Sequence, residues 1–386
     1  MVVLEIAEVS GWSADREDTV RHLLEQGGVV AILCDIPLIS EIELKRVEGG
    51  LLLGPACSFS IIGEKGIGIW NEVKPGPVGL VGTSSSGLRA LACLLSGIGI
   101  SHALHVGWRD LSQAVGAIST RRAIRFLQDD PKTECIVVLG VSSSPRVVRK
   151  LVEDVGGRKP VVFLLPDSPV AGGPSTLEEA AVTVARMMGQ ELNLEPPDDE
   201  LDELAREEAS KLAYGQKYVR GIFAGRFLCM EAQLILSRFS KTVYSNVPLR
   251  PRLRLPDPAS SQGHTCVDIS SPELSPEAHP SVKPEPYVRR ILREAKDPWT
   301  GSIVFDLTLG HGAHADPASV LSEAVAKARE ACEGTGGYLP VFVSLIGTER
   351  DPQDIRGQAR KLRKAGAIAV RSPSRAALLA VKTVEA

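Results

Sequence analysis

The feature that most constrains this chain is a repeated alternation of short apolar runs with segments of helical spacing. In residues 77–190, apolar runs such as ECIVVLGV and PVVFLLP alternate with helical segments. In residues 301–386, the runs SIVFDLTLG, PVFVSLIG and AIAVR do the same. Strands that are apolar throughout are buried on both faces. Each stretch therefore predicts a doubly wound parallel sheet covered by helices, which is an α/β fold.

The length and local composition predict four segments in the 386 residues. We expect a short α/β segment over 1–75, a first α/β domain over 76–192, an acidic helix and proline-rich connecting segment over 193–298, and a second α/β domain over 299–386. The first segment has only two or three strand candidates, too few for a full doubly wound sheet. Residues 247–287 are rich in proline, serine and charge, a composition that forms cores poorly.

Charge and cysteine content exclude several classes of partner and compartment. The net charge of −3 gives no reason to expect a nucleic acid or an anionic membrane as partner. No apolar run approaches the ~18 residues of a membrane helix, and the acidic N-terminus is unlike a signal peptide. The seven cysteines are an odd number without a CxxC pair, as in reduced thiols. We expect a cytoplasmic protein with cysteines in its core.

The first motif with chemical potential is GLVGTSSSGLRAL, residues 79–91. Glycines allow a tight turn after a strand, and free amides and hydroxyls then lie at the start of a helix, where the dipole favours anions. The candidate phosphate-binding residues are Thr83, Ser84, Ser85, Ser86 and Gly87. The motif lacks the lysine of a P-loop. An ordinary capped helix is the alternative interpretation.

The second motif is LTLGHGAHADPAS, residues 307–319, where a strand again leads through glycines into a helix. An imidazole at a helix start can donate, accept or transfer a proton. The candidates here are His311 and His314 for catalysis, and Gly310, Gly312 and Ala313 for binding. Two alternatives remain open: a loop histidine with a structural hydrogen bond, and a metal site of the two histidines with Asp316 and His264 or His279. We predict no metal, because the spacing matches no standard site.

Polar residues in several turns complete the candidate set. Arg109 and Asp110 follow the second strand of the first domain, at the edge where open α/β sheets bind ligands. A local ion pair between the two is an equally good interpretation. Asn246, His264 and His279 lie in other turn-rich segments and are candidate substrate-binding residues. The serine-hydrolase motif GxSxG is absent.

Taken in order, these motifs resemble those of the FdrA family, which is related to succinyl-CoA synthetases and NDP-forming acyl-CoA synthetases. The resemblance covers most of residues 50–386. It rests on GPAC at 54, GTSSSG at 82, WRDLS at 108, RGIFAGRFLC at 220, YSN at 244, HTCVD at 264, HP at 279, LGHGAHADPA at 309 and GTERDPQ at 347.

The resemblance implies two flavodoxin-like domains of the succinyl-CoA synthetase kind, in which two helix N-termini hold a phosphate. It also implies that residues 1–75 are a truncated CoA-binding-like segment. The sequence fixes no cofactor, and CoA is the one that the resemblance allows. The segment DSPVAGGPSTLEEAA has no histidine where synthetases of that superfamily carry the phosphorylated one. ATP use would need another subunit.

The leading hypothesis from this resemblance is a transferase subunit that acts on a phosphorylated small acid or carbamoyl phosphate. The family includes a subunit of an oxamate carbamoyltransferase. In this hypothesis Arg109 neutralises a carboxylate, and His314 or His311 moves a proton. The alternatives are an NDP-forming acyl-CoA ligase with a partner subunit and a non-catalytic scaffold or regulatory subunit. We expect a small anionic substrate or phosphate as ligand, and a homo-oligomer, association with other subunits, or both.

Overall fold

The computed structural model describes residues 6–141 and 144–385, and the chain forms two compact units. One unit holds the described residues up to Ser175 together with Glu179–Glu191. The other holds Thr176–Glu178 and the chain from Leu192 onward. The sheets are mainly parallel and alternate with helices, which confirms the α/β class. In the ranges described, no helix combines the length and apolarity needed to cross a bilayer.

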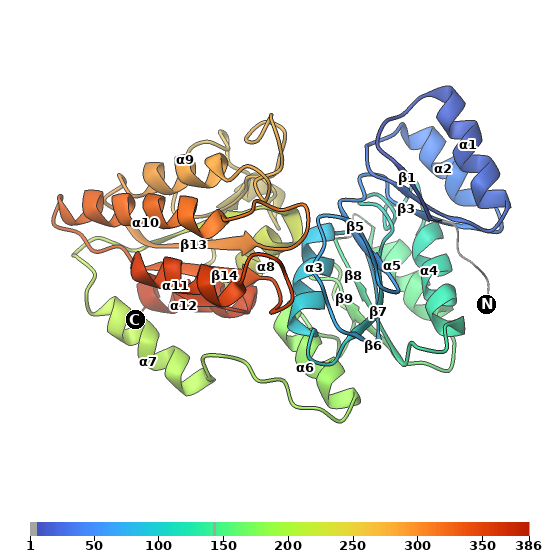
Figure 1. The fold of residues 1–386 in the computed structure, drawn as a ribbon. Coiled ribbons are helices and arrows are strands. Elements are labelled where there is room, and N and C mark those ends of the chain that lie inside the picture. Colours follow the sequence, from blue (N-terminus) through green and yellow to red (C-terminus); the bar gives the residue numbers. More distant parts are fainter. Residues whose placement is uncertain (1–5, 142–143, 386) are drawn as a thin grey trace. The chain divides into compact units, whose positions relative to one another are not determined.

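A three-stranded parallel sheet in the order β1-β2-β3 opens the first unit (Figure 1). Its strands and helices are β1 (Ile6–Val9), α1 (Ala14–Glu25), β2 (Val29–Ile32), α2 (Leu38–Arg46) and β3 (Leu51–Leu53). The Ser13 side chain caps α1 by accepting a hydrogen bond from the Arg16 amide. Val20 and Leu24 of α1 and Leu44 of α2 pack on Val30 and Leu52, so this sheet has a small core of its own.

A six-stranded sheet in the order β5-β4-β7-β6-β8-β9 follows in the same unit. Its strands are β4 (Phe59–Ile62), β5 (Lys65–Gly68), β6 (Pro75–Gly82), β7 (Ile100–His105), β8 (Cys135–Leu139) and β9 (Val161–Leu164). Its helices are α3 (Ser85–Leu94), α4 (Ile118–Asp129), α5 (Pro145–Asp154) and α6 (Leu177–Met187). Strands β6 to β9 pair in parallel, whereas β4 pairs antiparallel with β5 and β7.

The β4–β5 hairpin makes this sheet begin earlier than the boundary expected at residue 76. The apolar pattern gave no sign of it, because the sequence of β5, KGIG, has one buried position among its four residues. Its glycines also give it little strand propensity.

The second unit contains a fully parallel six-stranded sheet in the order β11-β12-β10-β13-β14-β15. Its strands are β10 (Tyr218–Phe223), β11 (Val243–Ser245), β12 (His264–Asp268), β13 (Thr300–Thr308), β14 (Val341–Ile346) and β15 (Ala367–Val370). Its helices are α7 (Asp198–Ala209), α8 (Arg226–Leu236), the short 3₁₀ helix η1 (Pro251–Leu253), α9 (Glu285–Glu294), α10 (Pro317–Glu333), α11 (Ile355–Lys364) and α12 (Pro373–Glu385).

The expectation of a connecting segment over residues 193–298 is corrected by this sheet, because β10, β11 and β12 are half of its strands. A charged residue makes β10 difficult to recognise as a strand in the sequence. Arg220 lies in the middle of that strand with 2% of its surface exposed, and it forms ion pairs with Glu294 and Asp297. The other two strands are short and lie among turn residues. A buried, paired arginine looks in the sequence like a surface residue.

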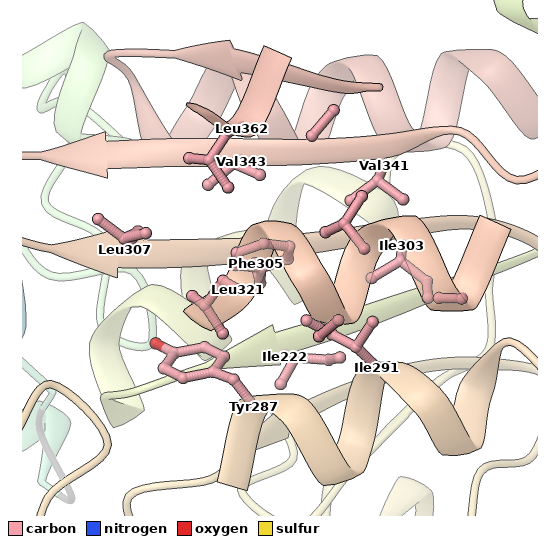
Figure 2. Packing of buried hydrophobic residues seen from close by; sticks show 14 of the residues in the cluster. Ile222, Tyr287, Ile291, Ile303, Phe305, Leu307, Leu321, Val341, Val343 and Leu362 are labelled. Atoms are coloured by element: carbon pink, nitrogen blue, oxygen red, sulfur yellow. The ribbon is translucent and has the colours of Figure 1, made fainter. Parts of the chain in front are cut away.

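Helices α9, α10 and α11 cover one face of the second sheet. Figure 2 shows Tyr287, Ile291, Leu321 and Leu362 from these helices against the strand residue Phe305 and its neighbours. Helices α8 and α12 pack on the opposite face. All seven cysteines are free thiols, and all but the partly exposed Cys34 are buried, which confirms the expectation of core cysteines.

Candidate functional site

The turn between β6 and α3 has the local structure that the first motif predicts. Ser84 is the N-cap of α3, and its hydroxyl accepts a hydrogen bond from the Gly87 amide at 3.4 Å. The Ser86 hydroxyl lies 3.2 Å from the Ser84 hydroxyl. The Thr83 hydroxyl is used within the fold, since it donates to the Val141 carbonyl and accepts from the Val141 amide.

The amides of Ser85 and Ser86 belong to the first turn of α3, where N–H groups have no acceptor within the helix. They are the backbone donors at the start of this helix. The approach to this turn requires a glycine: a Cβ on Gly82 would lie 2.7 Å from the Leu139 carbonyl oxygen. Two amides, the Ser86 hydroxyl and the positive end of the α3 dipole can together receive an oxyanion.

His105 lies beside this turn and was missed by the sequence analysis. It ends β7 and is the register partner of Gly82. Only 2% of its surface is exposed, and burial lowers the pKa of its imidazole to about 4. The ring is therefore neutral at pH 7. A histidine at the carboxyl end of a buried strand, next to a glycine turn, is the signal that could have identified it.

Arg109 and Asp110 do not pair with each other as the alternative interpretation expected. The Arg109 guanidinium donates to Glu41 Oε2 at 2.6 Å, to Asp35 Oδ1 at 2.9 Å and to the Ile36 carbonyl at 2.7 Å. It thereby joins the segment around α2 to the turn after β7.

Asp110 is fully buried and caps α4. Its carboxylate accepts hydrogen bonds from the Ser119 amide at 3.2 Å, the Thr120 amide at 2.8 Å and the Thr120 hydroxyl at 2.6 Å. Lys45, which is also fully buried, donates to Asp110 Oδ1 at 2.8 Å. The structure thus gives Asp110 a structural role at a helix start and leaves no room for a ligand on its carboxylate.

The second glycine turn, between β13 and α10, is held by hydrogen bonds of its own. Gly310 and Gly312 have positive φ angles of 118° and 76°. The Gln353 amide side chain accepts from Gly310 N at 3.0 Å and donates to Gly310 O at 2.7 Å. The Ala313 amide donates to Gly310 O at 3.3 Å, and the His314 amide donates to Ser281 O at 2.8 Å. An anion would have to compete for the amides of Gly310, Ala313 and His314.

The two histidines of this turn are half-buried. His314 Nδ1 accepts a hydrogen bond from the Asp316 amide at 3.1 Å, which leaves Nε2 as the ring atom for proton exchange. His279 lies nearby, because its Nδ1 accepts from the Ser281 amide at 3.2 Å and the Ser281 carbonyl receives the His314 amide. The structure therefore brings His279 and His314 to the same turn.

Asp316 is the N-cap of α10. Its carboxylate receives hydrogen bonds from the Ser319 hydroxyl at 2.6 Å, Gln358 Nε2 at 3.1 Å and Lys361 Nζ at 2.5 Å. Partial burial acts to raise the pKa of this carboxyl, but the donors outweigh it and hold the pKa well below its usual range. This network occupies the carboxylate that the metal alternative needed.

His264 lies at the amino end of its strand, whereas the second glycine turn lies at the carboxyl ends of the strands of the same sheet. It begins β12, whereas that turn follows the end of the parallel strand β13. Its Nδ1 accepts from the Val219 amide at 3.2 Å, and burial lowers its pKa to about 4. Among residues 6–141 and 144–385, no three histidine, cysteine or acidic side chains gather as ligands for one metal ion.

Asn246 is at the carboxyl end of the sheet, just after β11, but both its side-chain atoms are used. Its Oδ1 accepts from the Asp268 amide at 2.9 Å, and its Nδ2 donates to the Asp268 carbonyl at 2.8 Å. Asn246 therefore fixes the end of β12.

Two buried carboxylates at the turn before α8 were also missed by the sequence analysis. Asp306 Oδ1 accepts from the Ala224 amide at 2.8 Å, and Asp268 Oδ1 accepts from the Gly225 amide at 3.1 Å. Burial raises the pKa of both, that of Asp306 to about 6. The signal was an aspartate inside the apolar run SIVFDLTLG, which we interpreted only as a strand.

Comparison with known proteins identifies the family. The uncharacterized protein YahF of Escherichia coli (strain K12) is 31% identical over 395 residues, an alignment that covers 98% of this chain and 76% of YahF. The chain belongs to the YahF family. Residues 222–384 match the CoA-ligase family, so the second unit carries a CoA-ligase domain of the succinyl-CoA synthetase superfamily. The crystal structure of PH0766 from Pyrococcus horikoshii OT3 aligns with 99% of this chain and 83% of its own at 16% identity, with a TM-score of only 0.32.

Proposed function

We propose that this chain is an FdrA-like subunit of a transferase that binds a phosphorylated small acid, with carbamoyl phosphate as the leading candidate. The observation that carries the proposal is the turn between β6 and α3. There, serine side chains and first-turn amides lie at the positive end of a ten-residue helix. The order of the motifs GTSSSG and LGHGAHADPA, each at the start of a helix, supports the FdrA assignment.

In this proposal the amides of Ser85 and Ser86 donate to the phosphate oxygens, and the Ser86 hydroxyl adds a third donor. Such hydrogen bonds to an anion are stronger than those between neutral groups. A substrate carboxylate would bind Arg109 by replacing Asp35, whose side chain is 60% exposed, rather than the fully buried Glu41.

Calorimetric titration of the whole chain with phosphate, carbamoyl phosphate and oxamate tests the proposal. Ser85→Asp places a negative charge at the start of α3, where it still favours the helix but repels an anion. Ser85→Asn is the neutral control of nearly the same size. We expect carbamoyl phosphate binding to weaken at least tenfold in the aspartate variant, about 1.4 kcal/mol, and to change little in the asparagine variant. Absence of binding by the unmodified chain, or equal affinity in the aspartate variant, would refute it.

An NDP-forming acyl-CoA ligase is the second candidate, favoured by the CoA-ligase match over residues 222–384. It would act with a partner subunit that supplies the nucleotide site. Incubation of the chain and that partner with ATP, CoA and a panel of carboxylic acids would then yield an acyl-CoA. Product formation with CoA but not with carbamoyl phosphate would favour the ligase over the transferase.

A further inference from the structure

The second unit has a groove of about 1050 Å³ along the strand at one end of its sheet. Five consecutive residues, Ala367 to Arg371, line it. Strand β15 pairs with β14 on one side and, among the described residues, has no strand on the other. At the opposite end of the sheet, β11 is covered by a bridge between Ser245 and Arg254. The groove therefore lies along an uncovered strand edge, which can accept a further strand.

One wall of the groove is basic. Arg356, Arg360 and Arg363 of α11 all line it and have the spacing of residues on one helix face. Arg363 donates to the Ala369 carbonyl of β15 at 3.3 Å. The other two have weak partners: Arg356 pairs with Glu349 at 3.1 Å and Arg360 with Asp354 at 3.6 Å, all four side chains being more than half exposed. Exposed pairs of this kind contribute little stability. Carboxylates of an incoming segment can replace them at small cost.

The other wall is apolar with two acidic residues. It is formed by Glu195, Pro196 and Pro197, which precede α7, and by Glu200 and Leu204 of α7. The two walls lie on different faces of the sheet. Ala367 and Ala369 pack in the core under α9, α10 and α11, and alternation along the strand directs Ile368 and Val370 toward the opposite face.

We propose that this groove binds an extended segment of a partner protein in which acidic and apolar residues alternate, and that the segment pairs with β15 as a seventh strand. Successive side chains of a strand point to opposite faces. The acidic side chains would then face the α11 arginines, and the apolar side chains would face Pro196, Pro197 and Leu204. A shift by one residue would turn acidic side chains toward Glu195 and Glu200, so the groove also selects the register. Main-chain hydrogen bonds supply affinity, as in other strand additions.

Fluorescence anisotropy of the full chain with a labelled Val-Glu-Val-Glu-Val-Glu peptide tests this inference. We expect saturable binding that weakens with added salt, and none for a peptide with lysine in place of glutamate. In the double variant Arg356→Glu/Arg360→Glu, affinity should fall at least fivefold, since each exposed charge pair is worth up to about 1 kcal/mol. Arg252→Glu, an exposed arginine outside the groove, is the matched control. Circular dichroism checks that the variants fold.

Backbone methylation separates strand pairing from simple charge attraction. Two further peptides carry N-methyl groups on every valine or on every glutamate, and only one set of amides can face β15. We expect one of them to lose at least tenfold in affinity and the other to bind nearly as well as the parent peptide. Equal binding of both methylated peptides, or equal binding of the lysine peptide, overturns the inference. Self-association of the chain would also overturn the inference if sedimentation analysis shows it and the arginine variants abolish it. A second copy of the chain would then occupy the groove.

Discussion

Lys45 and Asp110 form a fully buried ion pair with 2.8 Å between Lys45 Nζ and Asp110 Oδ1. The lysine lies on α2 beside the three-stranded sheet, and the aspartate follows β7 of the six-stranded sheet. The same ammonium group donates to the Val106 carbonyl at 2.8 Å and lies 2.8 Å from Glu41 Oε1. One buried cation therefore ties the two sheets of the first unit together.

Replacement of this lysine should destabilise the first unit strongly. Lys45→Met leaves Asp110 buried without its counter-charge and leaves Glu41 with its ion pair to Arg109, and loss of one partner of a buried pair costs about 3–5 kcal/mol. Urea unfolding measures the loss. Lys150→Met, at an exposed position on α5, is the control and should change stability by less than about 0.5 kcal/mol. A Lys45→Met protein as stable as the control would show that the buried network contributes little.

A glycine in the turn after β7 should be irreplaceable. Gly107 has a φ of 92°, and a Cβ there would lie 2.3 Å from the Gly54 carbonyl oxygen. Gly107→Ala should cost about 2–4 kcal/mol from backbone strain and the clash. Gly27→Ala shares the positive φ, 83°, but its Cβ would meet nothing within 4 Å, so it should cost only about 1–2 kcal/mol. Thermal unfolding of both variants compares them, and equal losses would contradict the clash.

The parts of the fold that the sequence predicted are those in which each strand is predominantly apolar. The runs at β6, β8, β13 and β14 were recognised for that reason. Strand β10 was missed because its Arg220 is neutralised by acidic residues far along the chain, Glu294 and Asp297. Local pattern cannot reveal a partner that only the folded chain supplies.

The same distinction, between local sequence pattern and contacts that only the folded chain supplies, applies to the candidate site. Both glycine turns were predictable, because a strand, glycines and a helix are adjacent in the sequence. The use of the His314 amide by Ser281 and of the Arg109 guanidinium by Glu41 was not predictable, since these contacts join distant segments. A sequence can therefore identify a glycine turn, but it does not reveal which donors of that turn are available to a ligand.

The second unit should become less stable as the pH rises from about 4 to 6. Burial raises the pKa of Asp306 from 3.8 to about 6, so the folded state holds this proton more tightly than the unfolded chain does. The stabilisation is complete below the unfolded pKa and is lost as the pH passes the folded pKa, at most about 3 kcal/mol. Asp306→Asn should flatten this part of the curve of unfolding free energy against pH. Asp199→Asn, at an exposed site, should leave it unchanged; the opposite pattern would assign the slope elsewhere.

His105 should produce the reverse dependence in the first unit. Burial lowers its pKa from 6.5 to about 4, so the unfolded chain binds this proton more tightly than the folded chain. Its contribution to stability is complete above pH 6.5 and is lost as the pH falls toward 4, at most about 3 kcal/mol. NMR of the imidazole ring should show the neutral form throughout pH 5–8. His105→Asn should remove that resonance and flatten the acid side of the curve. A titration midpoint of His105 at pH 6 or above would show that the turn beside Gly82 is open to water.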